Sequence, residues 1–378
     1  MKFIHLSDLH LGKRVNNFSM IEDQKYILNE IIKISDLEKP DAFIIAGDIF
    51  DNPVAQAEAM TLFDEFLVNL SKRKIKVFII SGNHDSPERL SFGSRLMKKN
   101  EIYVSPVYDG NISPIILKTE SEDFCIYLLP FIKPIHVKTI FQNEKIETWN
   151  DALQIAIKKL NIDKNKINIL VTHQFVTGAK QSDSEEFAIG GCDNIDSSVF
   201  MDFDYVALGH IHSPQNIKIE KIRYCGTPLK YSFSEINNKN SVTIVEIKKK
   251  NDINISTIPL IPLRNMREIK GTYNDLTLKK NYENTNTNDY IHAILTDEND
   301  IPDALMKLRS IYPNLMKLDY DNNRTRNIQH LENGAEIESK TNIEHFSDFF
   351  EIQNNQKMTD EQLNFATNLM NSLWEEIK

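Results

Sequence analysis

The sequence predicts an α/β fold, because apolar runs of strand length alternate with helical patterns and because a polar motif follows each of five such runs. The runs are residues 3–6, 42–45, 77–80, 167–171 and 205–208. Residues 21–34 and 55–70 space their apolar side chains as amphipathic helices do. Strands and helices that alternate in this way are typical of parallel βαβ units.

The polar motifs are built from His, Asp and Asn, and half of the ten histidines lie in them. They are Asp8-Leu9-His10, Gly47-Asp48-Ile49-Phe50-Asp51, Gly82-Asn83-His84-Asp85, Thr172-His173 and Gly209-His210-Ile211-His212. Ligand sites of parallel sheets form beyond the carboxyl ends of the strands, where all of these motifs fall. Three of them begin with glycine, which suits unusual backbone geometry or close approach. We therefore expect the motifs to form one site.

The residue types in the motifs indicate a site for two metal ions. Carboxylate oxygen, amide oxygen and neutral imidazole together suit manganese, iron or zinc better than calcium or magnesium. Seven candidate ligands are too many for one ion and fit two ions that share a bridging carboxylate. Two ions roughly 3.5–4 Å apart bind a phosphate ester, activate a water and stabilise the leaving oxygen. The sequence thus predicts hydrolysis of phosphate esters.

In this order the motifs resemble the calcineurin-like metallophosphoesterases, whose pattern is D-x-H, G-D-x-x-D, G-N-H-[DE], a later His and G-H-x-H. Longer stretches look like the SbcD family, the bacterial counterpart of the Mre-type repair nucleases, and this resemblance runs to the C-terminus. They include "MKFIHLSDLHLGKR", "SGNHDSPERLSFGS", "LPF", "VALGHIHSPQ" and "YCGTPLKYSFSE". The resemblance implies a four-layer α/β/β/α sandwich, followed by a small α+β capping domain and C-terminal helices.

The resemblance also implies a ligand set for two divalent ions, with Mn²⁺ as the family's expectation. One ion would be held by Asp8, His10, Asp48 and His212, and the other by Asp48, Asn83, His173 and His210. Asp48 would bridge the two ions. The five histidines outside the motifs are expected to be structural or surface residues: His5, His136, His292, His330 and His345.

Three further motif residues are expected at the catalytic centre without binding metal. His84 matches the family's catalytic histidine, which interacts with the phosphate or protonates the leaving 3′-oxygen. Asp51 stands where archaeal and eukaryotic relatives have a second histidine, so it is given a supporting role. Asp85 either orients His84 or a water, or caps the helix that begins near Pro87.

Length and composition fit a multi-domain cytoplasmic enzyme. The 378 residues suggest two or three domains. No apolar stretch approaches the roughly 18 residues of a membrane span, and no signal-peptide core precedes Asp8. Cys125, Cys192 and Cys225 are few and scattered, which argues against a disulfide framework or a cysteine zinc site.

The net charge of −10 argues against a protein that coats nucleic acid by bulk charge, but it leaves a nuclease possible. Single basic residues beside the motifs are then the candidates for contacts to DNA phosphates. The resemblance places four of them near a DNA groove: Lys13, Arg14, Arg89 and Lys230. Tyr231 and Phe233 lie in the same segment as Lys230 and are expected to pack rather than stack on bases.

The chain after the last motif predicts the remaining domains. Strand patterns at 215–219, 222–225 and 242–247 suggest a second sheet that closes the nuclease domain, residues 1–262. A strand, strand, helix and strand over 267–276, 290–295, 302–311 and 315–320 form the predicted capping domain, residues 263–321. Residues 322–342 are polar and aperiodic, which predicts a flexible linker.

Two helices are predicted within residues 343–378, the second with a capping box from Thr359 to Gln362. Their apolar surface must be buried, either on the catalytic domain of the same chain or, as the resemblance favours, on the coiled coil of an SbcC-type, SMC-like ATPase. The candidate contact residues are Phe346, Phe349, Phe350, Leu363, Met370 and Leu373.

The expected function is that of the nuclease subunit of an SbcCD-like complex, with 3′–5′ exonuclease and single-strand or hairpin endonuclease action in DNA repair, replication and recombination. The resemblance implies a homodimer that forms through residues 55–70 or 87–99. This homodimer would be part of a heterotetramer. Two alternatives remain: a small-substrate metallophosphatase or phosphodiesterase, which leaves the capping unit unexplained, and a non-catalytic scaffold that clamps DNA.

Overall fold

The computed structural model describes residues 1–120, 122–185, 194–326, 341–354 and 356–375. The chain divides into two compact units, Met1–Asn265 and Met266–Lys378. The division falls three residues after the boundary expected from sequence at 262.

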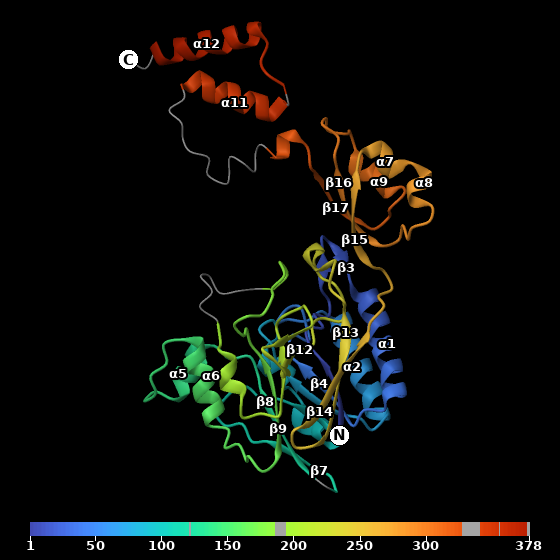
Figure 1. Ribbon diagram of the computed structural model, residues 1–378, viewed down its shortest axis with the longest axis vertical. Helices are drawn as coiled ribbons and strands as arrows, with labels where there is room; N and C mark the ends of the chain where they lie inside the picture. Colours follow the sequence, from blue (N-terminus) through green and yellow to red (C-terminus); the bar gives the residue numbers. More distant parts are fainter. Residues whose placement is uncertain (121, 186–193, 327–340, 355, 376–378) are drawn as a thin grey trace. The chain divides into compact units, whose positions relative to one another are not determined.

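Two six-stranded sheets form the centre of the first unit (Figure 1). In the first sheet the strand order is β14 (Asp252–Pro259), β13 (Ser241–Lys249), β1 (Lys2–Leu6), β4 (Ala42–Ala46), β5 (Lys76–Ile80) and β6 (Ile102–Val104). In the second it is β11 (Gln215–Ile217), β12 (Ile219–Tyr224), β10 (Tyr205–Gly209), β9 (Ile167–His173), β8 (Asp123–Leu129) and β7 (Ile115–Lys118). The five strands that precede the motifs pair in parallel, three in the first sheet and two in the second.

The sheets pack face to face, and helices cover their outer faces. Phe3 of β1 and Phe124 of β8 meet between the sheets, with ring centroids 6.1 Å apart. Outside the first sheet, Phe66 of α2 packs on Phe43 of β4 at 6.1 Å. Outside the second, Leu153 of α6 lies in the core. The main helices are α1 (Ile21–Glu38), α2 (Ala57–Lys72), α5 (Pro134–Ile140) and α6 (Trp149–Lys158). The predicted α/β/β/α sandwich is confirmed.

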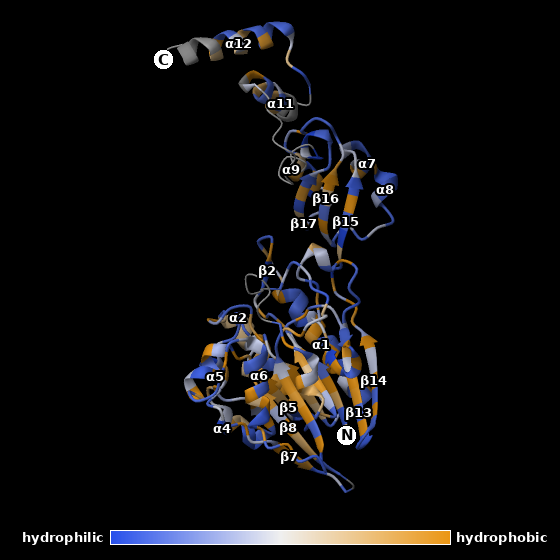
Figure 2. Cartoon of the chain, turned by 60° about the vertical axis from the view of Figure 1, so that its left-hand side comes forward, coloured by the Kyte–Doolittle hydropathy of each residue, from blue (hydrophilic) through white to orange (hydrophobic). Residues whose placement is uncertain are grey.

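Short elements complete this unit. They are β2 (Arg14–Val15), β3 (Phe18–Ser19), α3 (Pro87–Leu90), α4 (Ser94–Met97), η1 (Lys98–Asn100), η2 (Ser197–Phe200) and η3 (Phe233–Glu235). Figure 2 shows the apolar residues concentrated on the central strands, with β5 and β8 largely hydrophobic. This distribution is expected of strands buried on both faces.

The prediction for the strands after the last motif was partly wrong. β11 and β12 join the second sheet, but β7 to β10 already form most of it. β13 and β14 instead extend the first sheet, where β13 pairs antiparallel with β1. Without β13, β1 would expose an unpaired edge, which soluble sheets avoid. The alternation of apolar residues predicted the strands, but it did not predict which sheet each strand joins.

The second unit contains a parallel sheet of β15 (Met266–Gly271), β16 (Tyr290–Leu295) and β17 (Leu315–Tyr320). Its helices are α7 (Tyr273–Thr277), α8 (Lys279–Tyr282) and α9 (Ala304–Arg309). Leu276 of α7 and Leu308 of α9 pack on Ile291 and Ala293 of β16. The predicted strand over 267–276 ends at Gly271, because Thr272 caps α7 through a hydrogen bond from the Asp275 amide to its Oγ1, 3.1 Å long.

The C-terminal helices are α11 (Asn342–Asn354) and α12 (Asp360–Glu375). The capping box of α12 is present: the Thr359 amide donates to Gln362 Oε1 at 3.0 Å, and the Gln362 amide to Thr359 Oγ1 at 3.3 Å. The linker prediction was wrong for its first residues. Residues 323–326 are helical, and the Asn322 side chain caps them by accepting from the Thr325 amide at 3.1 Å. Residues 327–340 of that linker lie outside the described residues.

In the part of the chain that the structure describes, no helix is long and apolar enough to cross a membrane. Cys125 and Cys225 are buried free thiols. Cys192 lies outside the described residues.

Candidate active site

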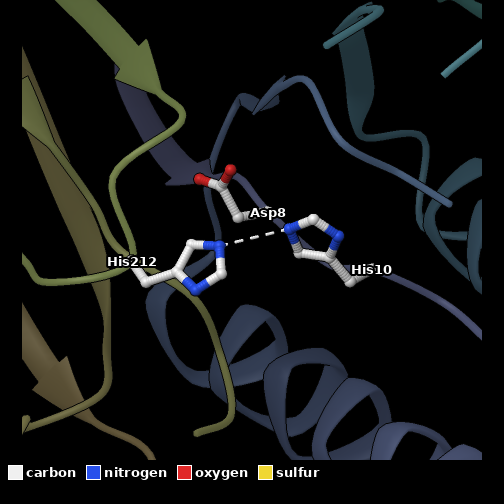
Figure 3. Close-up of side chains that lie close together, drawn as sticks. All are labelled: Asp8, His10 and His212. Atoms are coloured by element: carbon white, nitrogen blue, oxygen red, sulfur yellow. Dashed lines mark hydrogen bonds between the residues drawn. The ribbon is translucent and has the colours of Figure 1, made fainter. Parts of the chain in front are cut away.

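The fold brings together the motifs of both sheets. Figure 3 shows Asp8, after β1, beside the rings of His10 and His212. The two Nε2 atoms of these rings are 3.2 Å apart. One ligand atom each from Asp8, His10 and His212 lies within 4.8 Å of the others. Three side chains that the sequence assigns to one ion therefore meet.

A second group forms around Asn83. Its Oδ1 lies 3.0 Å from His173 Nε2 and 3.0 Å from His210 Nδ1. Phe131 stacks beside the His210 ring, with centroids 6.5 Å apart and planes at 25°. These are the side chains that the sequence assigns to the other ion.

Asp48 lies between the two groups. Its Oδ2 is 3.7 Å from His10 Nε2 and 3.3 Å from His173 Nε2. Its Oδ1 accepts a hydrogen bond of 2.9 Å from the His84 amide. The position of Asp48 is the one that a bridging carboxylate needs.

Close approach of neighbouring backbone and side chains explains Gly209 and Gly82 in the motifs. A Cβ on Gly209 would lie 1.9 Å from the carbonyl oxygen of Ala46, and one on Gly82 would lie 2.0 Å from Asp48 Oδ1. The loops are also conformationally unusual, since Asp8, His10, Asp48 and His210 all have positive φ angles, of 53°, 43°, 51° and 104°. L-residues rarely adopt such angles unless their surroundings impose them, and functional sites are where this happens most.

The electrostatics of the buried site favour a cation. Burial opposes ionisation of Asp48, but His173 and its hydrogen bond outweigh that effect and hold the pKa of Asp48 well below its usual range. Burial acts against protonation of His173, yet Asp48 and Asp8 raise its pKa to about 9. Burial lowers the pKa of His10 to about 4 and that of His210 to about 3. Without a metal ion, the two carboxylates thus hold a proton on His173, a positive charge that a bound metal ion would replace, whereas His10 and His210 are neutral, as metal ligation requires.

The hydrogen bonds of the histidines also fit metal ligation. His173 Nδ1 lies 2.8 Å from the Ala46 carbonyl oxygen, so Nδ1 carries a hydrogen and Nε2 is the nitrogen that would bind a metal ion after losing its proton. His212 Nδ1 lies 2.9 Å from Glu235 Oε1, which leaves its Nε2 facing that of His10. The two Nε2 atoms of His10 and His212 face each other. Both of their lone pairs can be used at once only by a cation or a proton that lies between them. The residues present therefore fit divalent metal ions.

His84 lies at the edge of this cluster. Its Nδ1 is 3.0 Å from the backbone oxygen of Asp51, and its ring meets that of His10 edge-on at 4.8 Å. A ligand atom of His84 also lies within 4.8 Å of His10 and Asp48. The geometry alone therefore allows both a catalytic and a ligating role. The Asp51 carboxylate pairs with Lys13 Nζ at 2.7 Å, so Asp51 supports the centre through its backbone and side chain alike.

Asp85 joins the loops of two motifs, and its expected role in orienting His84 or a water stays a prediction. Its carboxylate accepts from the amides of Gly82 at 2.9 Å, Phe50 at 3.0 Å and Ile49 at 3.1 Å, so it ties the second motif to the third. The helix-capping prediction was wrong, because Ser86 caps α3 by accepting from the Arg89 amide.

Two carboxylates that support His212 escaped the sequence reasoning. Glu235 is fully buried and accepts from the Tyr231 amide at 2.8 Å in addition to pairing with His212. Glu185 Oε1 accepts from the His212 amide at 2.8 Å. Glu235 ends the "YCGTPLKYSFSE" stretch, which was the available signal, whereas nothing in the sequence around Glu185 indicates its contact.

Of the four DNA candidates, Lys13 contacts a motif side chain, namely Asp51. Arg14 donates to the Asn17 backbone oxygen, and Lys230 donates to the Ile236 backbone oxygen at 2.6 Å. Arg89 lines an apolar hollow beside the second motif. Their contacts to DNA stay predictions. Tyr231 is buried and packs edge-on against His10, at 5.7 Å.

A hollow of about 510 Å³ lies between α11 and α12. Three of the predicted partner contacts line it, Phe346, Phe350 and Met370, together with Phe365 and Leu369. Two others, Phe349 and Leu363, are exposed at 57% and 38%. The Leu373 side chain lies outside the described residues.

Comparison with known proteins identifies the class of protein. Residues 1–214 match the family model described as calcineurin-like phosphoesterase, and the chain belongs to that family. Residues 262–354 match a second model, described as type 5 capsule protein repressor C-terminal domain. Over 353 residues the chain is 37% identical to a protein of Staphylococcus epidermidis named as the D component of the nuclease SbcCD, covering 92% of each. Within the calcineurin-like phosphoesterases, this is therefore a member of the SbcD family.

Solved structures resemble the chain over a smaller part. TT1561 of Thermus thermophilus has a TM-score of 0.39 at 11% identity and covers 68% of this chain and 98% of its own. A dimetal phosphatase of Danio rerio has a TM-score of 0.38 at 11% identity and covers 69% of this chain and 99% of its own.

Proposed function

We propose that this chain is the nuclease subunit of an SbcCD-like complex. It hydrolyses DNA phosphodiesters, as a 3′–5′ exonuclease and as an endonuclease on single strands and hairpins, in repair, replication and recombination. The observation that carries the proposal is the convergence of ligand side chains from both sheets, around Asp48. The relative of 37% identity over 92% of the chain, named as part of the SbcCD nuclease, supports the assignment to DNA.

The proposed cofactors of the chain are two divalent metal ions, and Mn²⁺ is the metal expected for the family. Asp8, His10, Asp48 and His212 would hold one ion, and Asp48, Asn83, His173 and His210 would hold the other. When bound, a pair of divalent ions polarises the phosphodiester, lowers the pKa of water and stabilises the leaving oxygen.

The protein's own groups position the reaction. Asp85 fixes the loops of Asp48 and His84 relative to each other, and Glu235 orients His212. His84 Nδ1 is held by the Asp51 backbone oxygen, so Nε2 is the nitrogen available to give a proton to the departing 3′-oxygen.

Two surfaces support the proposed assembly. The hollow between α11 and α12 suits an apolar segment of an SbcC-type ATPase coiled coil. The face formed by α2, α3 and α4 exposes Met60 at 57%, Phe92 at 84% and Leu96 at 70%, which suits a homodimer contact. Both contacts are proposals, as is cytoplasmic location.

The experiment compares the turnover of end-labelled single-stranded and hairpin DNA with that of a small chromogenic phosphodiester, in Mn²⁺. We expect DNA cleavage. Turnover of the small ester alone would favour a small-substrate phosphodiesterase, and DNA binding without any turnover, even with the ATPase partner added, would favour a scaffold.

A further inference from the structure

The segment that ends the first unit is fastened to α1. Residues 261–265 directly precede the second unit, and Ile261 and Leu263 are exposed at 75% and 39%. Arg264 anchors this segment: its Nη1 donates to Asp23 Oδ2 at 2.7 Å and its Nη2 to the Glu22 carboxylate. The Asp23 side chain is fully buried, and removing one partner of a buried ion pair is costly.

The next residue along α1 connects this anchor to the metal site. Gln24 is buried, and its Nε2 donates to the His10 backbone oxygen at 2.7 Å. Its Oε1 accepts from the Gly12 amide at 2.9 Å. Gln24 therefore holds the turn that gives His10 its disfavoured φ of 43°.

Tyr231 forms a second connection between the same segment and the same site. Its hydroxyl accepts from Gln24 Nε2 at 3.1 Å and donates to the Leu9 backbone oxygen at 2.5 Å. The preceding residue, Lys230, donates to Asn265 Oδ1 at 3.1 Å. Both connections run from the end of the first unit to the backbone on either side of His10.

We propose that Arg264 and Gln24 are positioning residues that couple the segment leading into the second unit to one of the two metal ions, the one assigned to Asp8, His10, Asp48 and His212. A displacement of this segment moves the first turn of α1, and Gln24 passes the movement to His10. A partner or DNA that acts on the second unit thereby changes the affinity for this ion. The inference rests on the proposed function for the presence of two ions.

The other ion gives an internal comparison. Gln24 bonds to the backbone of His10 and Gly12, whereas Asn83 Oδ1 lies beside His173 and His210, the side chains assigned to the other ion. Loss of the Arg264 contacts to α1 is therefore expected to weaken the binding of one ion and to leave the binding of the other unchanged. A general loss of stability would weaken both.

The test is calorimetric titration of Mn²⁺ into the metal-free full chain. Arg264→Gln is expected to weaken one of two binding events about tenfold, the lower end of the range for residues that orient ligands. Gln24→Met, which keeps the volume and removes the amide, is expected to weaken the same event at least as much. Repeating Arg264→Gln in an Asn83→Ala background, where one ion remains, assigns the weakened event.

Arg73→Gln is the matched control. Arg73 also forms a two-bond pair with an aspartate of α1, through contacts of 2.7 and 2.9 Å to Asp36, but at the far end of that helix. It is expected to leave both affinities unchanged.

Unchanged affinities in a folded Arg264→Gln protein, or equal weakening of both ions, would overturn the coupling. If that protein does not fold, Gln24→Met decides between the same outcomes. Because the readout is metal affinity, it remains decisive even if the wild-type chain proves not to cleave DNA.

Discussion

At the residue scale, the side chain of Asp48 connects several parts of the site. One carboxylate oxygen fixes the backbone of His84 and the other lies between His10 and His173. The resemblance to the calcineurin-like family implied this bridging position, whereas residue type and strand position predicted only that the motifs would meet at one site. The supporting residues could not be predicted in this way. Gln24 and Glu185 become neighbours of the site only through folding.

His84→Ala separates the two roles that the geometry allows for His84. We predict that cleavage falls by about 10²–10⁴-fold, the usual contribution of a general acid. Two ions per chain should remain, because the ligand set is complete without this ring. Metal content by atomic emission, measured beside the cleavage rate, checks the prediction. A loss of one ion would make His84 a ligand.

At the scale of elements, the strand that precedes the fifth motif depends on Gly209. A side chain there would collide with the Ala46 carbonyl of β4 in the facing sheet, at 1.9 Å. We predict that Gly209→Ala lowers the free energy of unfolding by about 1–3 kcal/mol, as overpacking does. Urea unfolding measures this. Gly93→Ala is the comparison, since a Cβ there meets nothing within 4 Å, although its φ of 74° adds some strain of its own. Equal losses in both variants would contradict the account.

The α11–α12 pair leads to a second prediction at this scale. Phe365 lines the hollow and is exposed at 70%. Phe365→Ser should weaken binding of the ATPase partner about tenfold or more, as removal of a central aromatic contact does, and leave cleavage of single-stranded DNA unchanged. Co-sedimentation measures the binding, with Leu37→Ser, an exposed residue of α1, as control. Undiminished binding would place the partner elsewhere.

Sequence patterns were less informative about elements than about residues. Three strands of the first sheet, β1, β4 and β5, and the capping box of α12 were predicted, since local periodicity and side-chain chemistry determine them. The strands β6 and β14 were not predicted. The assignment of β13 to the first sheet was not predicted either, because it depends on which edge is left unpaired after folding.

For the whole molecule, a buried histidine between the sheets links stability to pH. His5 contacts the Tyr205 hydroxyl at 2.8 Å, and burial, followed by Arg223, lowers its pKa to about 3. Because the folded state binds the proton less well than the unfolded state, stability is lost as pH falls below the unfolded pKa of 6.5. Between pH 7.5 and 5.5 this loss is about 1.4 kcal/mol for one such group.

We therefore predict that His5→Asn, which keeps a polar atom near Tyr205, reduces the pH dependence of unfolding by about that amount. Urea unfolding of the metal-free wild type and variant at both pH values checks it. An unchanged difference between the two pH values would show that His5 is not the group responsible.

The most direct test of the two-metal nuclease is cleavage of end-labelled single-stranded and hairpin DNA in Mn²⁺ by the intact chain, by Asp48→Ala and by His84→Ala. The account predicts cutting by the intact chain, none by Asp48→Ala and cutting about 10²–10⁴-fold slower by His84→Ala, with metal lost from the first variant and retained by the second. Undiminished cutting by Asp48→Ala would contradict it, because Asp48 is the carboxylate assigned to both ions and lies near a histidine of each group.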